Sequence, residues 1–237
     1  NDLCYRLRRA GWRLVISQRA FVHHEGSQTL RRVVPEPGSL LAQNHARYLA
    51  KWREDLELGY ASSLSGLSSE RISFDPSREP QGFWDEVKRL RGQAQVTLCM
   101  IVRDEERVID ECLRSASPFF SQVIIVDTGS TDKTKAIALQ RGAEVREIPW
   151  PDSFAEARNE SLRGATGKWI FWMDADDTLP PMSGMAILKA AIKADPSVSG
   201  FVLPVRFVDE GPHSGVQVDH VKLFRNLPGL EFEGRIH

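Results

Sequence analysis

Four short apolar runs alternate with helical patterns between residues 95 and 173, and this alternation limits the possible folds more than any other feature. Short, continuous apolar runs suit strands that are buried on both faces. Strands that alternate with helices form parallel sheets joined by right-handed crossovers. We therefore expect an α/β fold with a Rossmann-like, mostly parallel sheet and helices on both faces. The expected strands are Gln95–Val102, Val123–Val126, Ala143–Ile148 and Trp169–Met173.

The connecting segments contain helix start signals. Asp104 is placed to cap the first helix, and Ser153 begins a capping-box pattern before the third. After the fourth strand we expect a helix over Met182–Lys193. Two longer, alternating strands follow at Ser199–Val208 and Val218–Phe224. These strands predict an antiparallel or mixed extension of the sheet.

Polar side chains follow three of the four expected strands. Arg103 comes after the first strand, Asp127 ends the second, and an acidic cluster follows the fourth. Ligands of parallel sheets bind outside the carboxyl ends of the strands. We therefore expect these groups to converge on one crevice. The acidic cluster consists of Asp174, Asp176 and Asp177.

The acidic cluster has two interpretations, a solvated loop or a site for a divalent metal. Carboxylate oxygens are hard ligands that suit Mg²⁺ or Mn²⁺, and Mg²⁺ keeps positions open for substrate phosphates. If the strand continues, Asp174 and Asp176 point to the same side, so that one can reach a ligand hydroxyl while the other binds the metal. We interpret the cluster as a metal–phosphate site.

The turn after the second strand, Val126 to Thr134, also has two interpretations. It is either a generic strand–turn–helix connection or a ligand site. In the second case Asp127 accepts hydrogen bonds from a base or ribose, and Gly129 lets a ligand approach the backbone. The Gly-rich, Lys-containing spacing of a phosphate loop is absent.

Composition limits the partners. The net charge of -1 provides no global basic field, so neither nucleic acid nor a membrane surface is expected to bind through overall charge. No apolar run approaches the roughly 20 residues of a membrane span, so no transmembrane segment is expected. Three cysteines without metal-ligand spacing fit a reducing cytoplasm. Cys99 and Cys112 are expected in the core.

Composition also suggests a division of the chain. Residues 1–58 contain helical patterns at Asn1–Gly11 and Leu41–Leu58 and a short strand at Trp12–Ile16. A segment rich in Ser, Gly and Pro follows, as in linkers. We divide the chain into a fragment (1–58), a linker (59–93), whose end carries a short helix near Phe83–Arg91, and the main domain (94–237). Because the first residue is not Met, we expect a piece of a longer protein.

Several motifs of the main domain resemble a known family. TLCMIVRDEERVIDECLRS, VIIVDTGSTDKT and FAEARNESLRGATGKWIFWMDADD, in that order, resemble the nucleotide-sugar half of family 2 glycosyltransferases, which have the GT-A fold. VKLFRNLPGLEFEGRIH resembles the acceptor-side segment of lipo-oligosaccharide core glucosyltransferases. The resemblance implies a metal-dependent transferase of cell-envelope polysaccharide synthesis, located in the cytoplasm or at the inner face of the membrane. Its donor would be a nucleotide-diphosphate sugar and its acceptor a glycan, a lipid-linked saccharide or a protein.

The resemblance also implies roles for individual residues. Asp127 would contact the base or ribose, Asp174 the ribose or a bridging water, and Asp176 the metal, with Asp174 as a second metal ligand. Arg158 belongs to an Arg-Asn pair near the donor site, although a surface ion pair is an alternative for it. Thr128, Arg103 and Asp104 depart from the commonest family pattern, which leaves the donor base and sugar open. The residues implied to bind the nucleotide sugar are Ile101, Val102, Arg103, Asp127, Arg158, Asn159 and Asp174.

The start of the chain resembles the far end of the same family. NDLCYRLRRAGWRLVISQRAFVHHEG is similar to the acceptor-side segment that normally follows the DxD strand, and Asp2 is a candidate for its acidic motif. His23 or His24 could assist a metal or be a loop histidine without that duty. We therefore expect two tandem transferase domains, the tail of one followed by most of a second.

The family mechanism implies inverting transfer, in which a carboxylate deprotonates the acceptor hydroxyl. The sequence does not identify this base, and we expect it outside the fragment; surface roles are favoured for Glu233 and Asp209. Two rival functions stay open. Asp174, Asp176 and Thr178 also fit the D-x-D-x-T motif of haloacid dehalogenase-like phosphatases, in which the first Asp is the nucleophile. The other rival is a non-catalytic module that only binds a nucleotide or partner.

Overall fold

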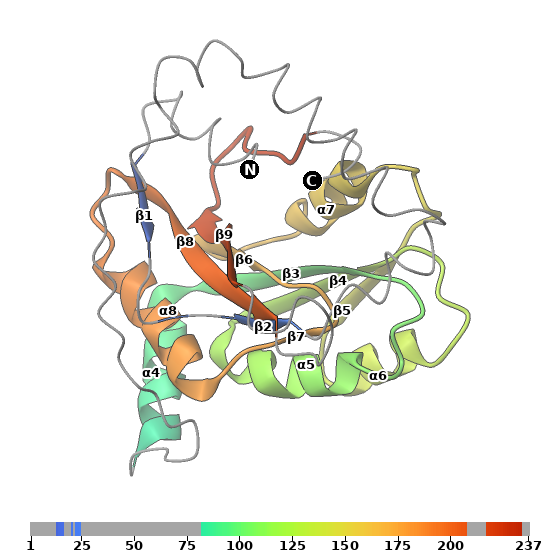
Figure 1. The fold of residues 1–237 in the computed structure, drawn as a ribbon, viewed down its shortest axis with the longest axis horizontal. Helices are drawn as coiled ribbons and strands as arrows, with labels where there is room; N and C mark the ends of the chain where they lie inside the picture. The colour runs from blue at the N-terminus through green and yellow to red at the C-terminus, as the bar shows by residue number, and fades with distance from the viewer. Residues whose placement is uncertain (1–12, 17–19, 21, 25–81, 208–216, 234–237) are drawn as a thin grey trace.

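The computed structural model describes residues 13–16, 20, 22–24, 82–207 and 217–233 (Figure 1). The strands are β1 (Arg13–Ile16), β2 (Val22–His24), β3 (Val96–Val102), β4 (Gln122–Asp127), β5 (Glu144–Glu147), β6 (Trp169–Trp172), β7 (Asp177–Thr178), β8 (Val198–Phe207) and β9 (Gln217–Arg225). The helices are α4 (Phe83–Ala94), α5 (Ile109–Ala116), α6 (Thr134–Gln140), α7 (Phe154–Leu162) and α8 (Pro181–Lys193), with a 3₁₀ turn η2 (Ser117–Phe119).

One sheet organises the described chain, with the strand order β5-β4-β3-β6-β9-β8-β2-β7 and with β1 paired to β8. The four strands β5, β4, β3 and β6 are parallel to one another. They lie within one or two residues of the four apolar runs, so the predicted strands and their parallel arrangement are confirmed. Their carboxyl ends lie at one edge of the sheet.

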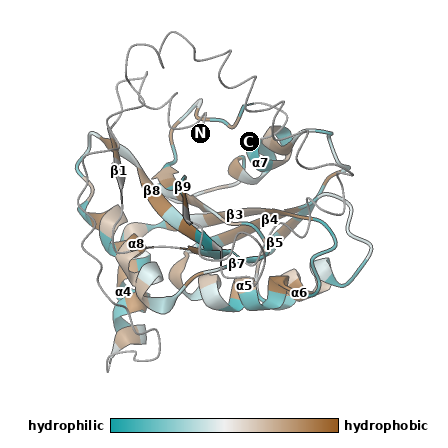
Figure 2. Ribbon diagram, viewed as in Figure 1, coloured by the Kyte–Doolittle hydropathy of each residue, from teal (hydrophilic) through white to brown (hydrophobic). Residues whose placement is uncertain are grey.

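Helices cover both faces of the parallel strands. Figure 1 shows α5 and α6 on one side of the sheet and α7 on the other. Along β3 the side chains alternate between two cores: Leu98 and Met100 pack with α4, α5 and α8, whereas Cys99 packs with Ile170 and Trp172 below α7. Figure 2 shows β3 and β4 as mainly hydrophobic. The expected α/β class is confirmed.

The second half of the sheet is the predicted mixed extension. β9 pairs antiparallel with both β6 and β8, so the hairpin of the two long strands continues the parallel sheet. The helix expected over Met182–Lys193 is α8, which begins one residue earlier behind Pro180. These expectations are confirmed, and they place β9 directly beside the strand that carries the acidic cluster.

The first described strands belong to this same sheet. β1 and β2 both run parallel to β8, and β2 also pairs antiparallel with β7, so that His24 lies opposite Asp177. The strand expected at Trp12–Ile16 is confirmed over 13–16. The expected helices at Asn1–Gly11 and Leu41–Leu58 and the linker before residue 82 lie outside the described residues. The division of the chain into domains stays a prediction.

One expected helix start is wrong. α5 begins at Ile109 without a side-chain cap, because Asp104 adopts a φ of 53° and its carboxylate accepts hydrogen bonds from Thr131 across the neighbouring loop. By contrast, Ser153 caps α7 through the backbone N–H of Glu156, as the capping box predicts. The short helix expected near Phe83–Arg91 is confirmed as α4. Among the described helices, none is long and apolar enough to cross a membrane.

Candidate active site

The acidic cluster forms a closed turn directly after β6. The backbone N–H of Asp174 donates to the carboxylate of Asp177 over 3.0 Å, and the N–H of Asp177 donates to the carbonyl of Asp174 over 3.1 Å. Asp177 then begins the short strand β7. Its buried carboxylate thus fixes the turn from within, which holds the side chains of Asp174 and Asp176 at the edge of the sheet.

Two buried cations neutralise two of the three carboxylates. Arg158 of α7 lies 2.7 Å from Asp174, and Lys222 of β9 lies 2.9 Å from Asp177; each cation is only 2% exposed. Both cations lie against the ring of Trp172, with the Arg158 guanidinium 4.3 Å and the Lys222 ammonium 3.7 Å from its centroid. Cations over an indole face gain several tenths of a kcal/mol to about 2 kcal/mol each. The last apolar strand residues therefore organise the charges that follow them.

Among the described residues, Asp176 is the one carboxylate of the turn that forms an ion pair with neither an arginine nor a lysine. Its side chain is 7% exposed, and the nearest basic group is the imidazole of His24 at 3.4 Å. Burial raises the pKa of Asp176 to about 7; His24 opposes this rise, and the charges of Asp174 and Asp177 add to it. A buried carboxylate that lacks a permanent cation partner is suited to bind a metal cation.

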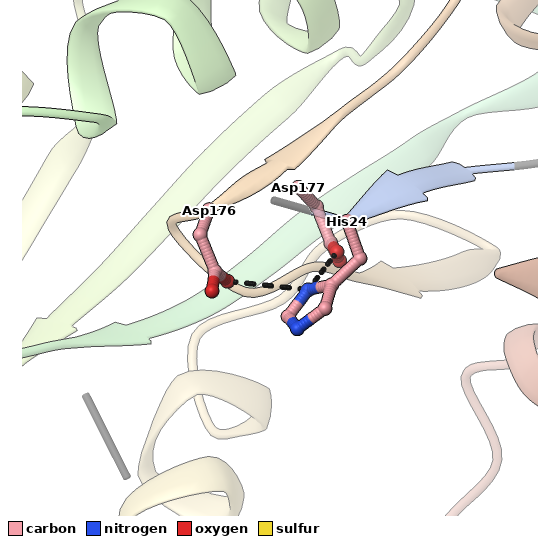
Figure 3. A group of neighbouring side chains, drawn as sticks. All are labelled: His24, Asp176 and Asp177. Atoms are coloured by element: carbon pink, nitrogen blue, oxygen red, sulfur yellow. Dashed lines mark hydrogen bonds and ion pairs between the residues drawn. The ribbon is translucent and has the colours of Figure 1, made fainter. Parts of the chain in front are cut away.

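His24 completes a candidate metal site with Asp176 and Asp177 (Figure 3). Its Nδ1 atom lies 3.0 Å from Asp177, and one ligand atom from each of the three residues lies within 4.8 Å of the others. Burial lowers the pKa of His24, but the hydrogen bond to Asp177 and the surrounding carboxylates outweigh this effect and raise it. Two carboxylates and one imidazole fit a divalent ion such as Mn²⁺. His23, the preceding residue, is not part of this group.

The other half of the candidate site lies at the end of β4. One carboxylate oxygen of Asp127 accepts the backbone N–H groups of Gly129 and Ser130 over 2.9 and 2.8 Å. Its second oxygen, Oδ2, is buried and has no hydrogen-bond partner among the described residues. Gly129 has a φ of 107°, which favours glycine in this turn. The arrangement leaves one buried acceptor for a donor group from a ligand.

The loop after β3 is fastened to the loop after β4. The N–H of Asp104 donates to the hydroxyl of Ser130, and the N–H of Glu105 donates to Thr134. Ile101 and Val102 end β3 beside this connection, and Arg103 is exposed. β4 and β6 lie on opposite sides of β3, so the two halves of the site are about 10 Å apart.

The structure brings some predicted residues together and uses others differently. Arg158 is a buried partner of Asp174, so the surface ion pair considered for it is wrong. Asn159 uses both ends of its amide on the backbone of Phe232. The binding of a nucleotide sugar by these residues stays a prediction, as it does for Ile101, Val102, Arg103 and Asp127.

Sequence reasoning gave no role in the site to Lys222 and only an optional one to His24, and it placed Asp177 in the acidic cluster without a separate role. The one signal for Lys222 was a charged residue between apolar neighbours, Val221 and Leu223, in an expected strand.

Comparison with known proteins identifies the family. The sequence model described as glycosyl transferase family 2 matches residues 97–231, and the chain therefore belongs to this family. The matched segment runs from the start of β3 to beyond β9 and contains the acidic turn, Asp127 and both buried cations. The predicted family and transferase class are thus confirmed. The narrower resemblance to lipo-oligosaccharide core glucosyltransferases stays a prediction.

Two curated relatives each match about 60% of the chain. A TPR repeat-containing protein of Synechococcus elongatus is 37% identical over 146 residues, which are 61% of this chain and 35% of the relative. The SPbeta prophage-derived glycosyltransferase SunS of Bacillus subtilis is 30% identical over 146 residues, 60% of this chain and 34% of the relative. The matched part of the chain thus corresponds to about a third of the length of these relatives.

Solved structures show a weaker likeness. Glucosyl-3-phosphoglycerate synthase of Mycobacterium tuberculosis, in complex with Mn²⁺, UDP and glucosyl-3-phosphoglycerate, is 22% identical with a TM-score of 0.35 and covers 46% of this chain and 40% of its own. A structure of a mycobacterial protein is 24% identical with a TM-score of 0.41 and covers 54% and 44%.

Proposed function

We propose that the protein transfers a sugar from a nucleotide-diphosphate sugar to a hydroxyl group of a glycan, a lipid-linked saccharide or a protein, with inversion and with a divalent cation. Membership of glycosyl transferase family 2 supports the reaction class. The observation that carries the proposal is the acidic turn, in which Asp174 and Asp177 each have a buried cation and Asp176 has only His24 beside it.

This charge arrangement suits the binding of a diphosphate through a metal. A divalent ion, when bound, supplies positive charge to the leaving diphosphate. Asp176 and His24, with Asp177 beside them, are the described residues that would hold it, and Mn²⁺ or Mg²⁺ fits their donor atoms. The Arg158 guanidinium orients Asp174 at the mouth of the turn, where this carboxylate is 39% exposed and can accept a hydrogen bond from a ribose hydroxyl.

The end of β4 supports the nucleoside half of the proposal. Asp127 has one oxygen held by the turn and a second that lacks a donor. A ribose hydroxyl or a base N–H would supply that donor. The hydrogen bonds between the loops after β3 and β4 keep this edge of the sheet in place before the ligand arrives, which reduces the ordering cost of binding. We assign the catalytic base to none of the described residues.

Calorimetric titration of the full-length protein tests the proposal. UDP-, GDP- and dTDP-sugars are titrated with Mn²⁺ and with EDTA, for the wild type and for Asp176→Ala. We expect binding of one donor class that requires the metal and is lost in Asp176→Ala. The matched control is Asp110→Ala, which removes an exposed carboxylate of α5 that is paired with Arg141 and is not part of the acidic turn.

Activity assays of the full-length protein distinguish the proposal from its two rival functions. Hydrolysis of a phosphate monoester would support the haloacid dehalogenase-like alternative, which has no support from the family match. Metal-dependent binding without sugar transfer by the full-length protein would support a non-catalytic module. Transfer with retention of the anomeric configuration, read by NMR, would contradict the inverting mechanism.

The two-domain arrangement and the cytoplasmic location are further parts of this proposal. The resemblance of residues 1–26 to a family tail supports a tandem protein, and the full-length sequence tests it. We expect a second strand with a DxD motif upstream of Asn1.

A further inference from the structure

The segment that follows β9 is fastened to α7 and the loop after it at both ends by an asparagine. We call residues 226–233 the strap. At its start, Asn226 donates its amide to the carbonyl groups of Ala165 and Gly167, each over 3.0 Å. Near its end, Asn159 of α7 donates to the carbonyl of Phe232 over 2.9 Å and accepts the N–H of Phe232 over 2.7 Å. The two hydrogen bonds from Asn159 hold the backbone N–H and carbonyl groups of Phe232, as the backbone of a neighbouring strand would.

The ring of Phe232, held in this way, forms one wall around the Arg158 guanidinium. The Arg158 Cζ atom lies 5.9 Å from the Phe232 ring and 4.3 Å from the Trp172 ring. Phe232 meets Trp172 edge-on at 6.3 Å and Phe224 at 5.9 Å. Together these rings leave Arg158 only 2% exposed. The strap therefore helps to shield the cation that holds Asp174.

A continuous set of contacts thus runs from the strap to the acidic turn. Asn159 fixes the backbone of Phe232, Phe232 covers Arg158, and Arg158 binds Asp174 over 2.7 Å. A hydrogen bond to a charged group is stronger where water is excluded. Release of Phe232 would admit water to Arg158 and loosen its hold on Asp174, although Asn159 itself touches no acidic residue of the turn in the described contacts.

We propose that Asn159 is a positioning residue of the donor site, which acts through the strap and Arg158 to hold Asp174 for the nucleotide sugar. This inference rests on the proposed function. It assigns Asn159 a role by way of Phe232 rather than direct contact with the donor. It also makes residues 226–233, on the acceptor side of the sheet, a structural link between the acceptor and donor halves of the site.

Asn159→Ala and Asn226→Ala in the full-length protein test the inference as a matched pair. Both variants remove an asparagine that fastens the strap with two side-chain hydrogen bonds, but only Asn159 fixes the residue that covers Arg158. We expect Asn159→Ala to weaken binding of UDP with Mn²⁺ about tenfold, because Asp174, less firmly held by Arg158, partly loses one charge-assisted hydrogen bond to the ligand, and to speed amide exchange at Phe232. Asn226→Ala should lower the melting temperature similarly and leave UDP affinity within about twofold.

A double-mutant cycle tests the route through the ring. Phe232→Ala removes the ring but keeps the backbone groups that Asn159 binds. We expect the double variant Asn159→Ala/Phe232→Ala to have the same affinity for UDP with Mn²⁺ as the single variant that binds UDP more weakly. Additive losses, or equal UDP affinities of Asn159→Ala and Asn226→Ala, would overturn the inference while the proposed function stands. Failure of the wild type to bind any nucleotide with metal would overturn the proposed function, and this inference with it.

Discussion

The ammonium group of Lys222 lies 2.9 Å from the carboxylate of Asp177, and both side chains are almost completely buried, at 2% and 0% exposure. Asp177 also accepts the backbone N–H of Asp174, so this ion pair supports the turn that carries the candidate metal site. Lys222 is thus placed to stabilise the acidic turn from its buried side, where water cannot replace the lysine as the partner of Asp177.

Lys222→Met should strongly destabilise the protein, because it leaves the Asp177 carboxylate buried without its lysine. Loss of one partner of a buried ion pair costs about 3–5 kcal/mol. Urea unfolding should show this loss, and Lys222→Met/Asp177→Asn should recover part of it. Lys135→Met is the control, since Lys135 pairs with Glu147 at the surface, where solvent screens the charges, and this variant should lose little stability. Equal losses in the two single variants would contradict the structural role of Lys222.

Asp127→Asn should weaken nucleotide binding with little effect on the free protein. The amide oxygen can still accept the N–H groups of Gly129 and Ser130, but the second position becomes a donor and can no longer accept a hydrogen bond from a ribose or base. A hydrogen bond to a charged group contributes about 1.5–3 kcal/mol, so UDP affinity should fall roughly 10- to 150-fold by calorimetry. Asp132→Asn, in the following turn, should leave affinity unchanged. Unchanged affinity in Asp127→Asn would contradict a nucleoside role.

The sheet was predictable because strands that are buried on both faces leave a strong local signal. The apolar runs ending at Val102, Val126 and Met173 predicted the strands, and strand–helix alternation predicted their parallel arrangement. The exact helix start after β3 was not predictable, because the Asp104 carboxylate has a partner in another loop, Thr131, 27 residues away. A capping signal in the sequence cannot exclude such a competing partner.

The acidic turn was predictable as a cluster, but its internal division of roles was not. Asp174, Asp176 and Asp177 look alike in sequence, and only the three-dimensional positions of Arg158 and Lys222 decide which carboxylate keeps no cation. His24 is 153 residues from Asp177 in the chain, and the pairing of β2 with β7 joins them. Long-range pairings of this kind have no local sequence signal.

His220 should make stability depend on pH. The pKa of His220 is lowered to about 4, mainly by burial and also by the charge of Lys222, against the weaker opposite effects of Asp174 and Asp177. The unfolded chain has the ordinary value of about 6.5, so neutral His220 stabilises the fold fully above this pH. That contribution is lost as the pH falls from about 6.5 toward 4. It should amount to roughly 1–3 kcal/mol.

His220→Phe isolates this effect, because phenylalanine keeps a ring against Trp172, which His220 meets edge-on at 6.0 Å, but does not titrate. Urea unfolding near pH 7 and near pH 5 should show a smaller loss on acidification for the variant than for the wild type. Identical losses would show that His220 is not neutral and enclosed in the folded protein.

The metal alone should stabilise the protein far less than the metal with UDP. Arg158 and Lys222 already neutralise Asp174 and Asp177, so an added ion finds one carboxylate in excess, that of Asp176, beside His24. The diphosphate supplies the additional oxygen ligands and negative charge that Mn²⁺ requires. Ligand at 100 times its Kd stabilises the folded state by about 2.7 kcal/mol. Thermal melting should therefore shift clearly with Mn²⁺ and UDP together and only slightly with either alone.

Variants of the acidic turn distinguish metal binding by Asp176 from a general attraction of Mn²⁺ to negative charge. Asp176→Asn removes the carboxylate that has no arginine or lysine partner among the described residues and should abolish the joint shift, and His24→Gln should reduce it. Asp110→Asn, which removes an equal charge from an exposed pair with Arg141, should melt with the wild-type shift. EDTA should reverse the shift in the wild type. If UDP in EDTA raised the melting temperature as much as UDP with Mn²⁺, the acidic turn would bind the diphosphate without a metal, and the charge assignment of Asp176 would be wrong.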